Sequence, residues 1–179
     1  FFMYAPLGDR IVKVGEHIKP HTFDKDIIET IDRLLPADMF LLVRLPPTDS
    51  VNLEGLSVSK RIIIERPGTN FGDGIKGIRA SEISPKDEQH LADTLLYCSG
   101  VITVFSSICV DASVFDKPVI LVGFDGKSVS YWESVRRLQE FDHMASVISS
   151  GGVMWVKDES HRSSFRLLGG FIVRYNGQP

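Results

Sequence analysis

The chain has 179 residues and a net charge of −3, and 43% of its residues are hydrophobic and 24% charged. This length predicts one domain, and the slightly acidic balance argues against nucleic acid or an anionic membrane surface as a partner. No apolar run approaches the roughly 20 residues that a membrane-spanning helix needs.

Short apolar runs recur along the whole chain. They do not alternate with polar residues, which is typical of strands buried on both faces of a parallel sheet. We therefore predict six strands, at residues 1–5, 38–45 ("DMFLLVRL"), 61–65 ("RIIIE"), 100–105 ("GVITVF"), 118–124 ("PVILVGF") and 152–156 ("GVMWV").

Amphipathic stretches of helical length lie between these runs. Residues 23–35 carry apolar side chains at helical spacing, with Thr22 as a candidate N-cap and Pro36 as a stop. A second helix begins more sharply, because Ser84 is a good N-cap and Pro85 suits the first helical position. The spacing predicts that its buried face consists of Leu91, Ala92, Leu95 and Leu96.

Three further helices are predicted in the second half of the chain. They cover residues 107–115, residues 132–149 with a break near Phe141, and residues 163–175. Strands and helices thus alternate through most of the sequence. This order predicts a Rossmann-like, doubly wound α/β fold with a mostly parallel sheet of about six strands and helices on both faces.

Two long stretches, residues 6–21 and 66–83, show little periodicity. Loops of this length in a compact domain are usually functional or disordered. The first residues, "FFMYAP", read as a strand already under way without a starting Met, so we expect a fragment of a longer protein. The two cysteines, Cys98 and Cys109, lie in apolar surroundings and lack CxxC spacing, which favours core thiols in a reducing compartment, the cytoplasm.

The segment after the predicted strand 100–105 carries the strongest chemical signal. Ser106 and Ser107 follow this strand and lead directly into a helix. Ligands of parallel sheets bind beyond the carboxyl ends of the strands, and a helix start offers free N–H groups that favour phosphate. Asp111 comes four positions after Ser107, on the same helix face, where its carboxylate can accept hydrogen bonds from ribose hydroxyls. The alternative is that a serine only caps the helix and that Asp111 faces solvent.

Other candidate residues follow the first two strands. Gly8 allows close backbone approach and Arg10 is a cation, although such a pattern is more often a turn with a surface ion pair. Arg44 places a charge inside a buried run and therefore needs a partner, which is either a structural salt bridge or an anion. The histidines and cysteines lack metal-ligand spacing, and neither a Walker A loop nor GxGxxG is present. We expect no metal and no cofactor.

The stretch "DTLLYCSGVITVFSSICVDASVFDKPVILVGFD", followed by Tyr131, resembles the donor-binding half of GT-B-type glycosyltransferases. It is similar to the group of CDP-glycerol glycerophosphotransferases and capsule polysaccharide enzymes. That group has a strand, paired serines, an acid four residues later, a "KPVI"-type strand, and then an Asp and a Tyr. UDP-N-acetylglucosamine 2-epimerases share a looser version. The tail "SGGVMWVKDESHRSSF" resembles the closing strand and acidic stretch of the same domain.

The resemblance implies roles for individual residues. Ser106 and Ser107 would hold the diphosphate, and Asp111 the ribose. Residues 79–83 would flank the base, and residues 8–10 would face the phosphates across a cleft between two domains. Pro46 occupies a position where the glycerophosphotransferases usually carry a His, so no imidazole is available there to protonate a leaving phosphate. This departure argues against glycerophosphate transfer and favours sugar transfer or an altered mechanism.

We therefore expect residues 1–179 to form one nucleotide-sugar-binding domain, the C-terminal half of a two-domain glycosyltransferase in cell-surface polysaccharide synthesis. Its donor would be a nucleoside diphosphate substrate, and a missing N-terminal domain would supply the general base. Two alternatives stay open, a UDP-sugar 2-epimerase-like enzyme and a non-catalytic nucleotide-binding or scaffold domain. The expected location is the cytoplasm. Peripheral attachment to the inner face of the membrane, through the missing part, also stays open.

Overall fold

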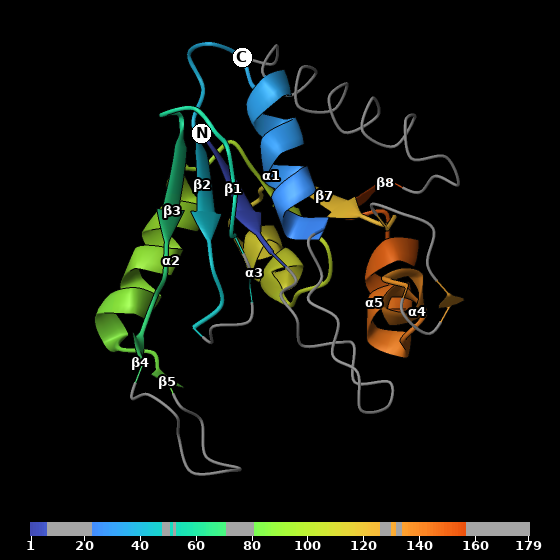
Figure 1. Ribbon diagram of the computed structural model, residues 1–179. Coiled ribbons are helices and arrows are strands. Elements are labelled where there is room, and N and C mark those ends of the chain that lie inside the picture. The colour runs from blue at the N-terminus through green and yellow to red at the C-terminus, as the bar shows by residue number, and fades with distance from the viewer. Residues whose placement is uncertain are drawn as a thin grey trace.

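The computed structural model describes residues 1–6, 23–47, 51, 53–70, 81–125, 130–131 and 134–156. Six parallel strands form one sheet in the order β3-β2-β1-β6-β7-β8 (Figure 1). This order confirms the predicted Rossmann-like fold and the six predicted strands. The strands are β1 (Phe2–Ala5), β2 (Leu41–Arg44), β3 (Ile62–Glu65), β6 (Gly100–Thr103), β7 (Val119–Val122) and β8 (Met154–Val156).

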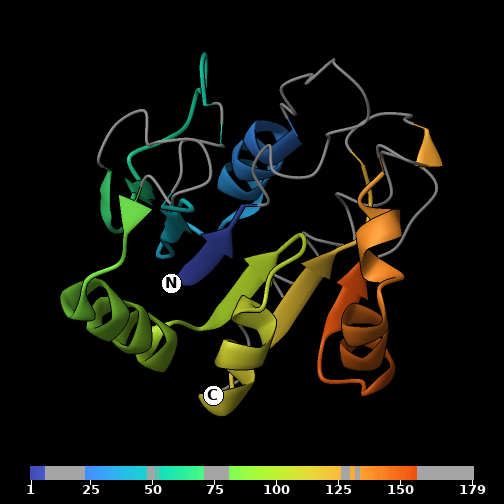
Figure 2. The same cartoon turned by 90° about the horizontal axis from the view of Figure 1, so that it is seen from below.

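Helices cover both faces of the sheet. Figure 2 shows α1 (Phe23–Leu34) on one side, and α2 (Pro85–Tyr97), α3 (Ile108–Val114) and α5 (Asp142–Ser149) on the other. Each side has its own core, since consecutive strand residues point to opposite faces. On β1, Phe2 and Tyr4 pack with α1, whereas Met3 packs with the helices of the other side. The short helix α4 (Arg136–Gln139) precedes α5.

Polar contacts anchor α1 at both of its ends. At its start, the buried Tyr4 hydroxyl donates to Asp24 over 2.6 Å, and burial raises the pKa of this phenol well above its ordinary value. At its end, the Arg61 guanidinium donates to the carbonyls of Asp32 and Leu35 over 2.8 and 2.6 Å. A cation on these carbonyls stabilises the negative end of the helix dipole. These contacts hold the segment before β3 against α1.

A close contact also fixes the end of β7. The Gln139 amide donates to the carbonyl of Val122 over 3.0 Å and accepts from the indole N–H of Trp155 over 2.9 Å. A Cβ atom on Gly123 would lie 2.1 Å from the Trp155 nitrogen, so only glycine leaves room for the indole. The end of β7, the helix α4 and the strand β8 are therefore joined through Gln139.

The helix predictions hold with one error. The predicted cap and first turn of α2 are confirmed, and the predicted break separates α4 from α5 at Phe141. Leu95 is buried as predicted, but the prediction for Leu96 was wrong, because this side chain is 49% exposed and Thr94 is buried instead. The orientation of α2 on the sheet therefore buries Thr94 and Leu95 and leaves Leu96 in contact with solvent. The cap at residue 22 and the helix at residues 163–175 lie outside the described residues.

The sequence also missed a small second sheet. Strands β4 (Thr69–Asn70) and β5 (Ser81–Glu82) pair antiparallel within the stretch that was predicted to be irregular. Gly68 precedes β4 with φ +83°, and a Cβ there would lie 2.6 Å from the Glu82 carbonyl oxygen, so the turn requires glycine. In the described segments, no helix is both long and apolar enough to cross a bilayer.

Candidate functional site

The carboxyl edge of the sheet has a point where the strand order reverses. On one side of β1 the sheet continues with β2 and then β3. On the other side, β6 pairs with β1 and begins the second half of the sheet. In open α/β sheets the crevice beyond the carboxyl ends of the strands at such a switch point is the usual place for a ligand. Figure 2 views the molecule from below, toward this edge. Among the described residues, the start of α3 lies at this edge, directly after β6.

The two serines before α3 have different roles. The Ser106 hydroxyl accepts from the backbone N–H of Ile108 over 3.3 Å, and its carbonyl accepts from the Cys109 thiol over 3.0 Å. Ser106 therefore makes the kind of contact that is expected if a serine only caps the helix. Ser107 occupies the N-cap position with φ −58°, it is exposed, and its side chain makes no capping hydrogen bond. Within the described residues, the N–H and hydroxyl of Ser107 have no partner.

Asp111 lies one helical turn beyond Ser107. Its N–H donates to the Ser107 carbonyl over 3.3 Å, which places both residues on one face of α3, as the four-residue spacing predicts. The side chain is exposed, and among the described residues no group forms a hydrogen bond or ion pair with its carboxylate. The structure thus brings Ser107 and Asp111 together as neighbouring groups on the surface. This arrangement suits a ribose ligand and a solvated helix face alike.

Arg44 has a structural partner. Its guanidinium forms an ion pair with Glu65, and its second terminal nitrogen donates to the Asp87 carbonyl over 3.0 Å. The register of β2 and β3 places Arg44 directly beside Glu65. His90 completes the group, since its Nε2 lies 2.7 Å from the second Glu65 oxygen. Of the two alternatives for Arg44, the salt bridge is present.

The start of α2 is held by a capping box. The Ser84 hydroxyl accepts from the N–H of Asp87 over 3.2 Å, and the Asp87 carboxylate accepts from the N–H of Ser84 over 3.0 Å. Hydrogen bonds from the Ser84 side chain, the Ser84 backbone and the Gly68 backbone lower the pKa of Asp87 to about 2. A carboxylate that is charged at neutral pH therefore ties α2 to the turn before β4.

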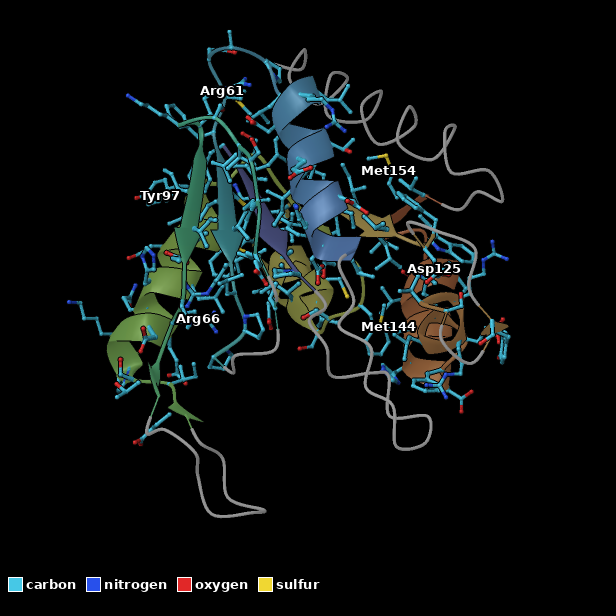
Figure 3. The ribbon with its side chains drawn as sticks, in the orientation of Figure 1. Arg61, Arg66, Tyr97, Asp125, Met144 and Met154 are labelled. Carbon is cyan, nitrogen blue, oxygen red and sulfur yellow. The ribbon has the colours of Figure 1, made fainter. Side chains whose placement is uncertain are left out.

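Asp125 follows β7 at the same edge of the sheet and is labelled in Figure 3. Its carboxylate accepts from the Ser134 hydroxyl over 2.5 Å and from the Val135 N–H over 2.9 Å, at the start of the turn that leads into α4. The Tyr131 hydroxyl donates to Glu140, and this hydrogen bond raises the pKa of the phenol. Asp125 and Tyr131, which the family resemblance singled out, therefore support the segment around α4.

An aromatic cluster that the sequence analysis missed adjoins the start of α3. Phe105, which directly precedes Ser106, meets Phe141 edge to face with ring centroids 6.2 Å apart. His143 completes the cluster, with its ring 5.8 Å from Phe105 and 6.1 Å from Phe141. Edge-to-face pairs of this kind contribute about 0.5–1.5 kcal/mol beyond their buried area. Phe141 and His143 lie in the stretch "EFDHM", where α5 begins. Two rings close together at a helix start were the sequence's only sign of this cluster.

Both cysteines are free and buried, as predicted. Burial raises the pKa of the Cys98 thiol and of the Cys109 thiol, which keeps both protonated and poorly nucleophilic. In the described part of the chain, no group of three or more potential metal ligands comes together. Gly8 and Arg10 lie outside the described residues, as do residues 79 and 80 of the segment expected to flank the base.

Comparison with known proteins gives one informative match. No protein-family model matches the chain, and the curated proteins contain no match either. Among solved structures, the chain is similar to a structure described as an S. aureus MnaA–UDP co-structure, with a TM-score of 0.53 and 15% sequence identity. The match covers 97% of this chain and 37% of that one, so this chain spans little more than a third of its neighbour's length. At this identity the likeness establishes a common fold, a Rossmann-like α/β domain of the kind that occurs within a larger UDP-bound protein.

Proposed function

We propose that this chain binds the nucleoside diphosphate part of a nucleotide sugar at the start of α3, and that it serves as the donor-binding part of a glycosyltransferase in cell-surface polysaccharide synthesis. The observation that carries the proposal is the exposed pair Ser107 and Asp111 at the switch point of the sheet. Among the described residues, their polar groups have no partner. The UDP in the fold neighbour makes UDP the first nucleotide to test.

The phosphates would lie at Ser107. Its N–H stands before the first turn of α3 and has no intrahelical acceptor, and its hydroxyl adds a second donor. Ser106 contributes indirectly, because its hydroxyl and carbonyl hold the turn in shape. Gly8 and Arg10 are proposed to approach the same anion, because they follow β1 in the sequence and β1 neighbours β6 in the sheet.

The ribose would lie against Asp111. A carboxylate one turn beyond the phosphates does not bind them, but it can accept from both hydroxyls of a ribose. Arg44 takes no direct part in this proposal, because Glu65 and the Asp87 carbonyl already occupy its guanidinium.

In the proposed reaction, the bond between the sugar's anomeric carbon and the diphosphate oxygen breaks, and the electron pair stays on the diphosphate. The donors at Ser107 and the cation Arg10 would stabilise this developing charge. The general base that deprotonates the acceptor hydroxyl would come from a part of the protein outside this chain.

Binding can be tested by calorimetry with UDP and with inorganic pyrophosphate. Ser107→Ala keeps the backbone N–H and removes the hydroxyl. Ser107→Pro also removes the N–H, and the observed φ of −58° suits proline. We expect Ser107→Ala to weaken binding of both ligands modestly and Ser107→Pro to weaken it further. Val114→Ala, at the far end of α3, is the matched control and should leave affinity unchanged. Unaltered binding by Ser107→Pro, with an unchanged melting temperature, would contradict the phosphate site.

A 2-epimerase-like activity is the second candidate, because UDP-sugar 2-epimerases share the looser form of the serine motif and the fold neighbour binds UDP. The two activities differ in what they need. An epimerase converts a UDP-sugar without an acceptor, whereas a transferase releases UDP only when an acceptor is present. Product analysis with and without a polysaccharide acceptor therefore separates them. Nucleotide binding without either reaction in the full-length protein would favour the non-catalytic alternative.

A further inference from the structure

We infer that the rings of Phe105, Phe141 and His143 form a surface that stacks on a ring of the bound nucleotide sugar, either its base or its sugar. This aromatic surface would be a second part of the binding site, beside the donors at Ser107. The inference rests on the proposed function.

The chain itself places the aromatic surface next to the proposed phosphate position. Phe105 precedes Ser107 by two residues, so their Cα atoms lie within about 7 Å of each other. The other two rings come from the start of α5, and both meet Phe105 directly, at centroid distances of 6.2 and 5.8 Å. The helices α3 and α5 lie side by side on the same face of the sheet, and both begin at its carboxyl edge (Figure 2).

The rings are held in place on one side and open on the other. Phe105 is half-buried and packs on the core beneath α3 and α5, whereas Phe141 is 45% exposed and His143 is exposed. The neighbouring Met144 is buried in that core, which anchors the start of α5 (Figure 3). In the described part of the chain, the imidazole of His143 has no hydrogen-bond partner. Fixed, solvent-facing rings lose little conformational entropy when a flat ligand covers them.

This chemistry complements what Ser107 and Asp111 lack. Hydrogen-bond donors and a carboxylate recognise phosphate and ribose, but they offer nothing to the flat face of a base or to the apolar face of a sugar. Aromatic side chains supply that contact, and stacking tolerates different ring types because it does not depend on hydrogen-bond pattern. The imidazole nitrogens add polar groups at the rim.

The test compares Phe141→Ala with Phe141→Leu, which keeps apolar bulk without an aromatic face. Tyr97→Ala is the control, because Tyr97 is 73% exposed and lies at the last residue of α2, near the opposite edge of the sheet (Figure 3). Affinities for pyrophosphate, UDP and UDP-N-acetylglucosamine are measured by calorimetry on the same preparations. We expect both Phe141 variants to weaken binding of a ring-bearing ligand by roughly fivefold to thirtyfold, the size of one lost stacking contact, and to leave pyrophosphate binding unchanged.

Each outcome decides the inference. A loss that already appears with UDP assigns the aromatic surface to the base, and a loss that appears only with the UDP-sugar assigns it to the sugar. Equal losses for pyrophosphate, or unchanged affinity for all three ligands, would overturn the aromatic surface while leaving the proposed function intact. A wild-type chain that binds no nucleotide would overturn both proposals.

Discussion

The carboxyl edge of the sheet has two polar regions with opposite character. Beside β2 and β3, the charged groups of Arg44, Glu65 and His90 meet one another. Beside β6, the exposed groups of Ser107 and Asp111 have no partner among the described residues. Both regions follow parallel strands at the same edge, so position in the fold does not explain the difference.

The difference separates groups that stabilise the fold from groups that are available to a ligand. Taking a charge out of water is costly unless a partner replaces the water, and Arg44 is largely buried and paired. Exposed groups bear no such cost, and they remain free to exchange water for a ligand. The first region should therefore respond to mutation through stability, and the second through affinity. Two predictions test this division directly, and two more concern the capping box of α2, whose Asp87 carbonyl contacts Arg44.

Asp111→Ala should produce the largest change, and it should be a change in affinity. Losing a hydrogen bond to a charged group costs about 1.5–3 kcal/mol, so UDP binding should weaken by that amount. The unfolding free energy should hardly change, because the side chain is exposed. Calorimetry and urea unfolding measure the two effects. An equal loss for pyrophosphate, which has no ribose, would contradict the ribose role.

Arg44→Ala should lower the unfolding free energy by about 2 kcal/mol, because it leaves Glu65 partly buried and without its strongest partner. The remaining contact to His90 limits the loss. Urea unfolding measures the change, with the exposed Lys86→Ala on α2 as control. UDP affinity of the folded protein should stay the same. A large loss of affinity in a stable Arg44 variant would restore the anion-binding alternative.

Ser84→Ala should lower the unfolding free energy by about 1 kcal/mol, the usual contribution of an N-cap serine. The variant removes the hydroxyl that accepts from the Asp87 N–H and leaves the rest of α2 unchanged. Thermal or urea unfolding suffices to measure it. An unchanged unfolding free energy would mean that the hydrogen bonds of the capping box make no net contribution to stability.

The smallest effect concerns acid. The pKa of Asp87 is about 2 in the folded chain against 3.8 ordinarily, so its carboxylate stabilises the fold above about pH 4. That contribution should disappear as the pH falls from about 4 to 2. Melting curves over this range should show a smaller decline for Ser84→Ala, because Ser84 donates the main hydrogen bonds that lower this pKa. Parallel curves for the two proteins would contradict the assignment.

Local patterns predicted much of the fold. The six strands were found because continuous apolar runs need burial on both faces, and the start of α2 because the capping signal of Ser84 and Pro85 is local. The helix α3 and the shared face of Ser107 and Asp111 were also predicted, since helical spacing is set by backbone geometry alone. The pair β4–β5 was missed because each of its strands has only two residues and carries no periodicity.

The sequence by itself thus determined the order of the elements, the strand-to-helix transition at Ser106, and the residues that lie there. Only the tertiary structure decided which charges are paired. Arg44 meets Glu65 through the register between two strands, and Phe105 meets Phe141 because α5 packs beside α3. The same packing left Leu96 exposed and buried Thr94. Such contacts depend on how elements distant in sequence pack together, whereas helix starts and strand runs depend on neighbouring residues along the chain.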